Sequence, residues 1–439
     1  MRIPGTPGRA FGSLSQSDRL ARLCGMRPDW DVLVIGAGLA GLAAGATAAK
    51  AGSATLVLDA HLPGGRARVT KKNGFVFNRG SHALYKGAEG WEVLRSLGIE
   101  PLGSPPPLGR YQALAGGELH LLPTGPGSLR RTTLLRRMDK EAFAALLARL
   151  PLLRRGRYAG ASVSQWITAA GLGPAAVAAV YALIRLTTYA SNMDTFAADA
   201  AIAQLQRAAS GVVYVDGGWD QLISGLAALC QVRAGVKVTG VARAAGRVEV
   251  ATSNGPLTAR SVIIAVGRPA AAIRLLPADP GWGDLGPAVT AACLDAGLWR
   301  VPDPGYVVGV DAPVYAAVQS PPARQAPAGQ AVVGAVRYGA TEAKADRAVL
   351  EAHLARAGVQ EEDIVTSRFL ARMVVAGAAP IAARGGLGGR PAVDATGLPG
   401  VYLAGDWVGP TGLIADAALA SGQAAAVRAV QAFPVTTAT

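Results

Sequence analysis

Three glycines and one acid near the start of the chain have the residue types and the spacing of a dinucleotide-binding turn. Gly36, Gly38 and Gly41 directly follow the apolar run 31–35, and Asp59 comes about 20 residues later. The first glycine permits a tight turn, the second lets backbone approach a pyrophosphate, and the third lets a helix pack closely on a strand. Asp59 can accept hydrogen bonds from ribose hydroxyls, and it would repel a 2′-phosphate.

The flanking residues predict the elements that hold this turn. Residues 31–35 are typical of a buried parallel strand, 42–50 are rich in alanine and predict a helix, and 54–58 predict a second strand that ends at Asp59. The helix would direct free N–H groups and a partial positive charge at the phosphates. The glycines could also merely ease helix–strand packing. Strand, turn, helix, strand and acid in this order favour the dinucleotide site.

A second glycine-rich loop follows the second predicted strand. Gly64, Gly65 and Arg66 would lay backbone and a guanidinium along the other side of a pyrophosphate. A domain that binds only NAD has no need of such a loop. The segment 80–85, with the sequence GSHALY, comes shortly afterwards.

These motifs together resemble the flavin amine oxidase and phytoene desaturase superfamily, and the segment 80–85 is most similar to its phytoene-desaturase-like branch. The resemblance implies an FAD cofactor, with the glycines of such a segment letting backbone reach the isoalloxazine ring. Two features depart from the family. The loop from Asp59 to Gly64 is one residue shorter, and Asp59 stands where the family commonly has Glu. Both changes move the ribose contact slightly, and neither removes it.

Later segments extend the resemblance. Residues 214–219 and 236–241 are similar to the returning FAD strand, in which Val241 matches the valine whose backbone holds adenine. Near the C-terminus, the acid that matches Asp406 holds the ribityl or phosphate region of the flavin. The resemblance implies that the helix after Gly412 aims its N-terminus at the pyrimidine edge of the ring, where its dipole would stabilise a reduced, anionic flavin. Taken alone, Asp406 would fit a helix-capping or turn acid.

The predicted cofactor contacts all lie on these turns, loops and helix starts. They are Gly36, Gly38, Leu39, Ala40, Gly41, Asp59, Ala60, Gly64, Gly65, Arg66, Ala67, Gly80, Ser81, His82, Val241, Gly405, Asp406, Gly412, Leu413 and Ile414.

The fold class implied is α/β, with a discontinuous Rossmann-type FAD-binding domain and a second α+β substrate-binding domain. The FAD-binding domain is expected to combine residues 29–100, 205–275 and 395–439, and the substrate-binding domain 101–204 and 276–394. Residues 1–28 are rich in Gly, Pro, Ser and Arg and are expected to be a disordered tail. Helices over about 138–200 and short strands at 306–310, 315–318 and 331–335 are expected in the second domain.

The lysines and cysteines indicate which chemistry to expect. The amine-oxidase branch places a lysine near the reactive flavin nitrogen and an aromatic cage around the substrate amine. This chain has no lysine between Lys237 and Lys344, and Trp407 is the only aromatic residue beside the C-terminal helix. No cysteine follows Cys293, which excludes a covalent flavin link from a C-terminal cysteine. Non-covalent FAD is therefore expected, in a dehydrogenase, desaturase or oxidase that takes a hydride from a mostly apolar small molecule.

Alternatives remain open at this point. They are a flavin-dependent amine oxidase, a redox-neutral isomerase that uses reduced flavin to move double bonds, and a flavin-binding protein without turnover. His82 and Tyr85 are the candidates for catalytic side chains near the ring. A buried structural histidine and a packing tyrosine explain the same two residues, and the residues do not identify the electron acceptor.

Composition excludes several other classes. The chain has 439 residues, of which 51% are hydrophobic and 16% charged, so it is not a disordered polypeptide. Cys24, Cys230 and Cys293 form no pair, and the four histidines have no metal-ligand spacing, so no metal site is predicted. The net charge of +14 would suit nucleic acid, but aromatic residues do not interleave with a basic run, so no nucleic-acid partner is expected.

Part of the positive charge is clustered. Nine basic residues interleave with leucines: Arg130, Arg131, Arg136, Arg137, Lys140, Arg149, Arg154, Arg155 and Arg157. Such a surface could dock peripherally on anionic lipid and admit an apolar substrate, or it could be a solvated helical face. No secretory signal opens the chain. A cytoplasmic location is therefore expected, with membrane association at the inner face as the further expectation.

Overall fold

The computed structural model describes residues 28–80, 82–283 and 285–432, so the tail expected over 1–28 falls almost entirely outside the described residues. A first sheet has seven strands, and the predicted glycine turn follows one of them, β1. Its order is β10-β2-β1-β13-β12-β11, with β19 also paired to β13. The strands are β1 (Trp30–Ile35), β2 (Thr55–Asp59), β10 (Gln231–Ala234), β11 (Val238–Ala244), β12 (Arg247–Thr252), β13 (Leu257–Ile264) and β19 (Val401–Leu403).

The strands around β1 are parallel, as the apolar run 31–35 predicts. β1 pairs in parallel with β2 and β13, and β10 and β19 extend this parallel part, whereas β12 and β11 return antiparallel. The carboxyl ends of β1 and β2 therefore meet at one edge of the sheet, where the glycine turn and Asp59 lie side by side.

Alanine-rich helices pack on this sheet. α2 (Leu39–Lys50) lies against α12 (Ile414–Gln431), and α3 (Glu89–Ser96) and α9 (Asp220–Ala227) pack beside them. The helices approach closely because the contact residues are small: a Cβ on Gly422 would lie 2.3 Å from the carbonyl oxygen of Ala40. The short helix α10 (Pro269–Ile273) follows β13.

A second seven-stranded sheet has the order β18-β14-β17-β16-β15-β7-β8. It is antiparallel except between β15 and β7, and α11 (Ala343–Arg356) packs on it. Its strands are β7 (Gln112–Ala115), β8 (Glu118–Leu121), β14 (Val289–Leu298), β15 (Tyr306–Gly309), β16 (Val314–Ser320), β17 (Ala331–Tyr338) and β18 (Ile364–Ala376). The three short strands predicted from sequence correspond to β15, β16 and β17.

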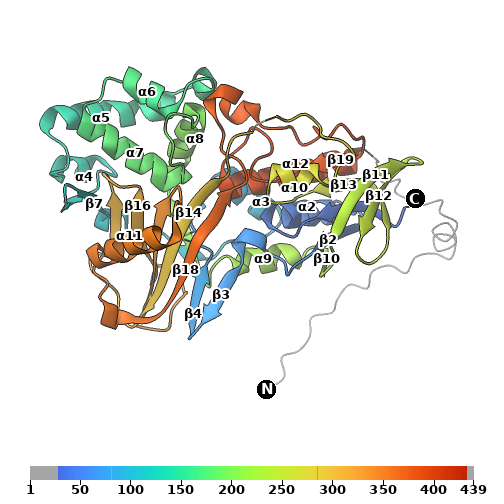
Figure 1. Ribbon diagram of the computed structural model, residues 1–439, viewed down its shortest axis with the longest axis horizontal. Helices are drawn as coiled ribbons and strands as arrows, with labels where there is room; N and C mark the ends of the chain where they lie inside the picture. The colour runs from blue at the N-terminus through green and yellow to red at the C-terminus, as the bar shows by residue number, and fades with distance from the viewer. Residues whose placement is uncertain (1–27, 81, 284, 433–439) are drawn as a thin grey trace.

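Five helices form a layer at the end of the molecule farthest from β11 and β12 (Figure 1). They are α4 (Pro126–Arg131), α5 (Arg137–Arg149), α6 (Val163–Ala169), α7 (Pro174–Thr188) and α8 (Ala198–Ala208). Within the described ranges, no helix is both long enough and apolar enough to cross a membrane. The apolar stretch 158–184 is divided between α6 and α7, with Gly173 capping α7.

Five short strands form two further small sheets. β3 (Val69–Lys72) and β4 (Phe75–Asn78) form a hairpin, and β9 (Val212–Val215) pairs with β5 (Leu84–Tyr85) and β6 (Gly103–Ser104). Single 3-10 turns lie at Gly65–Ala67, Leu108–Arg110, Leu150–Leu152, Arg155–Tyr158, Glu361–Asp363, Ala382–Arg384 and Gly386–Gly389.

Candidate functional site

One large cavity, of about 2180 Å³, runs from the glycine turn to the helical layer. Its first part, the dinucleotide arm, is lined by Gly36, Gly38, Leu39, Ala40, Asp59, Ala60, Gly64, Gly65, Arg66, Ala67, Gly405 and Asp406, together with Val236–Thr239 of the returning strand. Its second part, the apolar arm, is lined by residues of 106–189 and of β18. His82, Leu413 and Ile414 lie along the wall as well.

The three glycines have the separate functions that their spacing predicts. Gly36 has φ +107°, and a Cβ there would lie 2.5 Å from the carbonyl oxygen of Ala265. A Cβ on Gly41 would lie 1.8 Å from the carbonyl oxygen of Gly36, so this glycine serves close packing and does not line the cavity. Gly38 has open space around it and caps α2. Backbone at the N-terminus of α2 is therefore open to a phosphate group.

Asp59 holds the turn together from the end of β2. Its two carboxylate oxygens accept hydrogen bonds from the N–H groups of Ala37, at 2.7 Å, and His61, at 2.8 Å. Because each carboxylate oxygen can accept two hydrogen bonds, the side chain keeps acceptor capacity for ribose hydroxyls in the cavity. The carboxylate is thus both a structural brace and a candidate ribose ligand.

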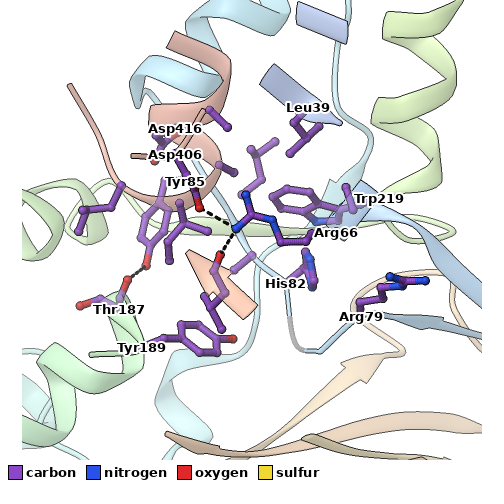
Figure 2. A pocket seen from close by; sticks show the side chains of 18 of the residues that line it. Leu39, Arg66, Arg79, His82, Tyr85, Thr187, Tyr189, Trp219, Asp406 and Asp416 are labelled. Carbon is purple, nitrogen blue, oxygen red and sulfur yellow. Dashed lines mark hydrogen bonds and ion pairs between the residues drawn. The ribbon is translucent and has the colours of Figure 1, made fainter. Parts of the chain in front are cut away.

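Arg66 lines the dinucleotide arm, and its side chain is held by two partners within the chain. Its guanidinium forms an ion pair with Asp406, at 2.7 Å, and donates to the carbonyl oxygen of Val375 at 3.0 Å (Figure 2). Burial lowers the pKa of Arg66, but the adjacent carboxylate more than offsets this and the net shift is upward. The side chain is accessible from the cavity, so it can still contact a phosphate there.

Asp406 supplies the sharpest test of whether a cofactor fits. The residue is 3% exposed, and one carboxylate oxygen, Oδ2, accepts from Arg66 and from the N–H of Gly377 at 3.0 Å. The other oxygen, Oδ1, is buried and has no partner. A buried acceptor left unpaired costs about 1–3 kcal/mol. A hydroxyl donor such as those of the ribityl chain would satisfy it, so Asp406 and the open turn at Gly38 fit an FAD.

The environment of His82 leaves its imidazole neutral. Burial lowers the pKa of His82 to about 4, and the cations Arg368 and Arg66 act in the same direction. Nδ1 forms a hydrogen bond with the carbonyl oxygen of Gly80 at 2.7 Å. The ring packs edge-on against Trp219, with ring centroids 4.8 Å apart. A neutral imidazole held in this way fits a wall residue better than a proton donor at pH 7.

Tyr85 and Asp416 lie together at the other side of the cavity (Figure 2). The Tyr85 hydroxyl donates to the carbonyl oxygen of Thr187 at 3.3 Å, and burial raises its pKa. Asp416, in the first turn of α12, is 2% exposed and accepts from the N–H of Gly90 at 3.1 Å. Burial raises the pKa of this carboxyl to about 7. Asp416 is a site residue that the sequence analysis did not select.

Several predicted contacts do not line the cavity. The N–H of Val241 donates to the carbonyl oxygen of Leu275 at 2.8 Å, and Val238, three residues earlier on the same strand, lines the cavity instead. Because valines recur along 236–241, similarity of sequence assigned the family's valine to Val241, three residues beyond Val238. Gly80 packs behind the wall, where a Cβ would lie 2.6 Å from Cε of Met373, and Gly412 packs on Asp416 and Ala417. Ser81 lies outside the described residues.

A buried ion pair near His82 was also missed. Arg368 of β18 pairs with Asp295 of β14 and donates to the carbonyl oxygen of Asn78, and it lines the cavity. Its members lie 73 residues apart in the chain, and no local motif marks either. Trp407, by contrast, is fully buried against Trp282, with ring centroids 5.4 Å apart, and contributes nothing to the cavity wall.

Comparisons with known proteins agree with this geometry. A family model described as flavin containing amine oxidoreductase matches residues 39–292, more than half of the chain. In a comparison with curated proteins, no sequence matches this chain.

Solved structures of 17–19% identity share the fold. An oxidoreductase from Methanosarcina mazei superposes with a TM-score of 0.71 at 17% identity, covering 90% of this chain and 99% of its own. A putative protoporphyrinogen oxidase from Exiguobacterium sp. 255-15 superposes with a TM-score of 0.66 at 19% identity, and the match covers 91% of this chain and 98% of its own. Cyclohexylamine oxidase from Brevibacterium oxydans IH-35A superposes with a TM-score of 0.70 at 18% identity, and the match covers 92% of this chain and 99% of its own. The chain belongs to the flavin containing amine oxidoreductase family and is an FAD-dependent oxidoreductase.

Proposed function

We propose that this enzyme takes a hydride from a C–H bond of a mostly apolar small molecule, as a dehydrogenase, desaturase or oxidase. The supporting observation is the lining of the apolar arm. The structure describes residues 101–204 in full, and no charged side chain among them lines the cavity. The leucines of this stretch that line the cavity are Leu108, Leu122, Leu129, Leu147, Leu150, Leu183 and Leu186.

An apolar wall of this kind selects against a protonated amine. Among the described residues of 276–394, those with charge that line the cavity are Arg368 and Arg372, both cationic. An ammonium group entering the apolar arm would lose its hydration without gaining a carboxylate partner there, which costs several kcal/mol. An apolar chain would instead gain about 25 cal/mol for each Å² that it buries.

The lysines support the same choice. Lys237 is the one lysine among the described residues that lines the cavity, and it lies at the dinucleotide arm beside Val236 and Val238. Lys344 lies exposed in the first turn of α11. Neither position fits a lysine that acts on a substrate in the apolar arm.

The chain's own residues would position the substrate and exclude water. Bound FAD supplies the hydride acceptor. The leucines of the apolar arm would hold an apolar chain against the junction of the two arms and keep that junction dry. His82, neutral and bonded to Gly80, contributes shape rather than a proton. In total the substrate would lose a hydride to bound FAD and a proton to solvent, and its mass would fall by two hydrogens.

Product mass together with one pair of variants tests the proposal. The FAD-loaded enzyme is incubated with apolar polyenes, and with primary amines carrying the same carbon skeletons. We expect polyene products lighter by two hydrogens. Leu147→Asp, on the cavity wall, should lower polyene turnover at least tenfold with flavin retained, whereas Leu119→Asp, half-exposed on β8 and off the cavity, should not. Turnover of the amines alone would overturn the proposal, and an unchanged polyene mass would favour an isomerase.

A further inference from the structure

The apolar arm opens to solvent beside α4 and α5. Six residues both line the cavity and are exposed there: Leu108, Thr124, Pro126, Ala144, Ala148 and Pro151. None carries a charge. They mark an uncharged mouth, so an apolar molecule can enter the cavity there without passing a charged side chain of this set.

Cations are concentrated on the same segment of the chain that lines this mouth. Eight exposed arginines and the half-buried Lys140 form what is called here the basic surface: Arg130, Arg131, Arg136, Arg137, Lys140, Arg149, Arg154, Arg155 and Arg157. The same stretch contains two acids, Asp139 and Glu141, and Glu141 is paired with Arg137 at 3.3 Å. The net positive charge is therefore concentrated on one short segment that also forms part of the cavity wall.

Large apolar side chains project from the basic surface. Met138, at the start of α5, is 83% exposed, and Leu152, just beyond its end, is 80% exposed. Between them the exposed face of α5 carries Ala144, Ala145 and Ala148. Leu152 follows Leu150 and Pro151, which line the cavity. Exposed apolar groups ringed by cations are the pattern of a helix that lies in a membrane interface.

We propose that the basic surface docks on an anionic lipid bilayer, with Met138 and Leu152 inserted, so that the mouth of the apolar arm faces the acyl chains. Charge complementarity selects the occupant, because arginines bind the phosphates and carboxylates of anionic lipids. The delivery of substrate from the bilayer rests on the proposed function, whereas the docking itself rests on the surface alone.

A nucleic acid fits this surface less well. Stacking of bases needs exposed aromatic rings among the cations. The two aromatic residues in and beside this stretch offer no such ring: Phe143 is fully buried, and Tyr158 is half-buried and packs on Trp166, with ring centroids 6.3 Å apart. The exposed groups among the arginines are aliphatic, which suits acyl chains.

Sedimentation with vesicles tests the docking without any substrate. The FAD-loaded protein is mixed with vesicles of phosphatidylcholine alone and of phosphatidylcholine with 30% phosphatidylserine. We expect sedimentation with the anionic vesicles only, weakening strongly as salt is raised from about 50 to 500 mM, because screening shortens the reach of surface charges. Absence of sedimentation at low salt, or binding to heparin and duplex DNA without binding to vesicles, would overturn the proposal.

Matched variants locate the contact. Arg130, Arg136 and Arg149 are exposed, and their triple replacement by Gln should weaken vesicle binding by about a hundredfold, at about fivefold for each charge near the surface. A control triple with the same loss of charge, Arg233→Gln, Arg268→Gln and Arg428→Gln, replaces exposed arginines elsewhere and should bind nearly as well as the unchanged protein. Equal losses of vesicle binding in the two triple variants would show that binding depends on net charge and not on a docking face, and would overturn the proposal.

A depth probe tests the orientation independently of activity. Tryptophan placed at Leu152 should be quenched by brominated lipid in anionic vesicles, and tryptophan placed at Val427, 42% exposed on α12, should not. Quenching at Val427 but not at Leu152 would place the membrane on another face. Because neither readout uses turnover, docking can fail while apolar oxidation stands, and the reverse holds as well.

Discussion

The Arg66 guanidinium and the Asp406 carboxylate form an ion pair 2.7 Å long between residues that are 340 positions apart in the chain. Arg66 belongs to the second glycine loop, and Asp406 lies between β19 and α12. The pair therefore fastens the C-terminal segment to the N-terminal one directly at the cavity. It leaves Asp406 Oδ1 without a partner, which is the acceptor that a bound FAD would use.

Arg66→Ala should lower FAD occupancy and thermal stability together. The substitution leaves the buried Asp406 carboxylate with the Gly377 N–H as its remaining partner, and an uncompensated buried charge is strongly destabilising. Flavin absorbance per protein and the melting temperature measure the two effects. Arg95→Ala, which removes an exposed 4.0 Å pair with Glu92, serves as the control and should change neither. Full flavin retention in Arg66→Ala would contradict the position assigned to the cofactor.

Asp59→Ala should also lower FAD occupancy, through a different contact. It removes the ribose acceptor and the two hydrogen bonds that brace Ala37 and His61. Asp59→Glu, which restores the acid found commonly in the family, should recover most of the flavin. Titration of the flavin-free proteins with FAD gives the affinities. If Asp59→Ala binds FAD as tightly as the unchanged protein, Asp59 does not hold the ribose.

Asp416→Asn should stabilise the protein at alkaline pH. Burial raises the pKa of Asp416 from an ordinary 3.8 to about 7, so between these values the folded chain retains a proton that the unfolded chain has released. Stability is therefore lost as pH rises through this window, and Asn, which cannot ionise, avoids the loss while its amide oxygen can still accept from Gly90. We expect no difference in the free energy of unfolding at pH 4, and a gain of about 2–4 kcal/mol at pH 8.

Denaturant unfolding at the two pH values measures this difference. Asp279→Asn replaces an exposed acid and is the control, with no pH-dependent gain expected. A destabilised Asp416→Asn at pH 8 would show that the carboxylate is ionised and needed in the folded state.

Lys344→Ala should leave turnover intact. Lys344 lies exposed at the start of α11 and does not line the cavity. Steady-state rates with the substrate identified by product mass provide the measurement. A loss of more than about tenfold would restore the amine-oxidase interpretation, in which a lysine acts beside the flavin.

Local chemistry explains which parts of this structure the sequence could predict. The turn at Gly36, Gly38 and Gly41 was predictable because it belongs to a local strand–turn–helix motif, and the structure confirms the positive φ of Gly36 and the close approach at Gly41. The partners of Arg66 were not predictable, because an ion pair across 340 residues leaves no periodicity or spacing.

Strand register limited the prediction elsewhere. Valines recur through 236–241, so sequence similarity alone placed the cavity contact at Val241, three residues beyond Val238, which lines the wall. Asp416 falls within the helix predicted after Gly412, and nothing in the sequence shows that α3 covers it. Its burial, and with it the raised pKa, comes from the tertiary contact with Gly90.

An anaerobic absorption spectrum of the purified protein, recorded before and after addition of apolar polyene lipids and then of amines, tests the central claim most directly. We predict a bound flavin spectrum that bleaches with the lipids and not with the amines. Bleaching with amines alone would keep the fold and the cofactor but contradict the substrate class. A protein that neither contains nor takes up FAD would contradict the account of the cavity itself.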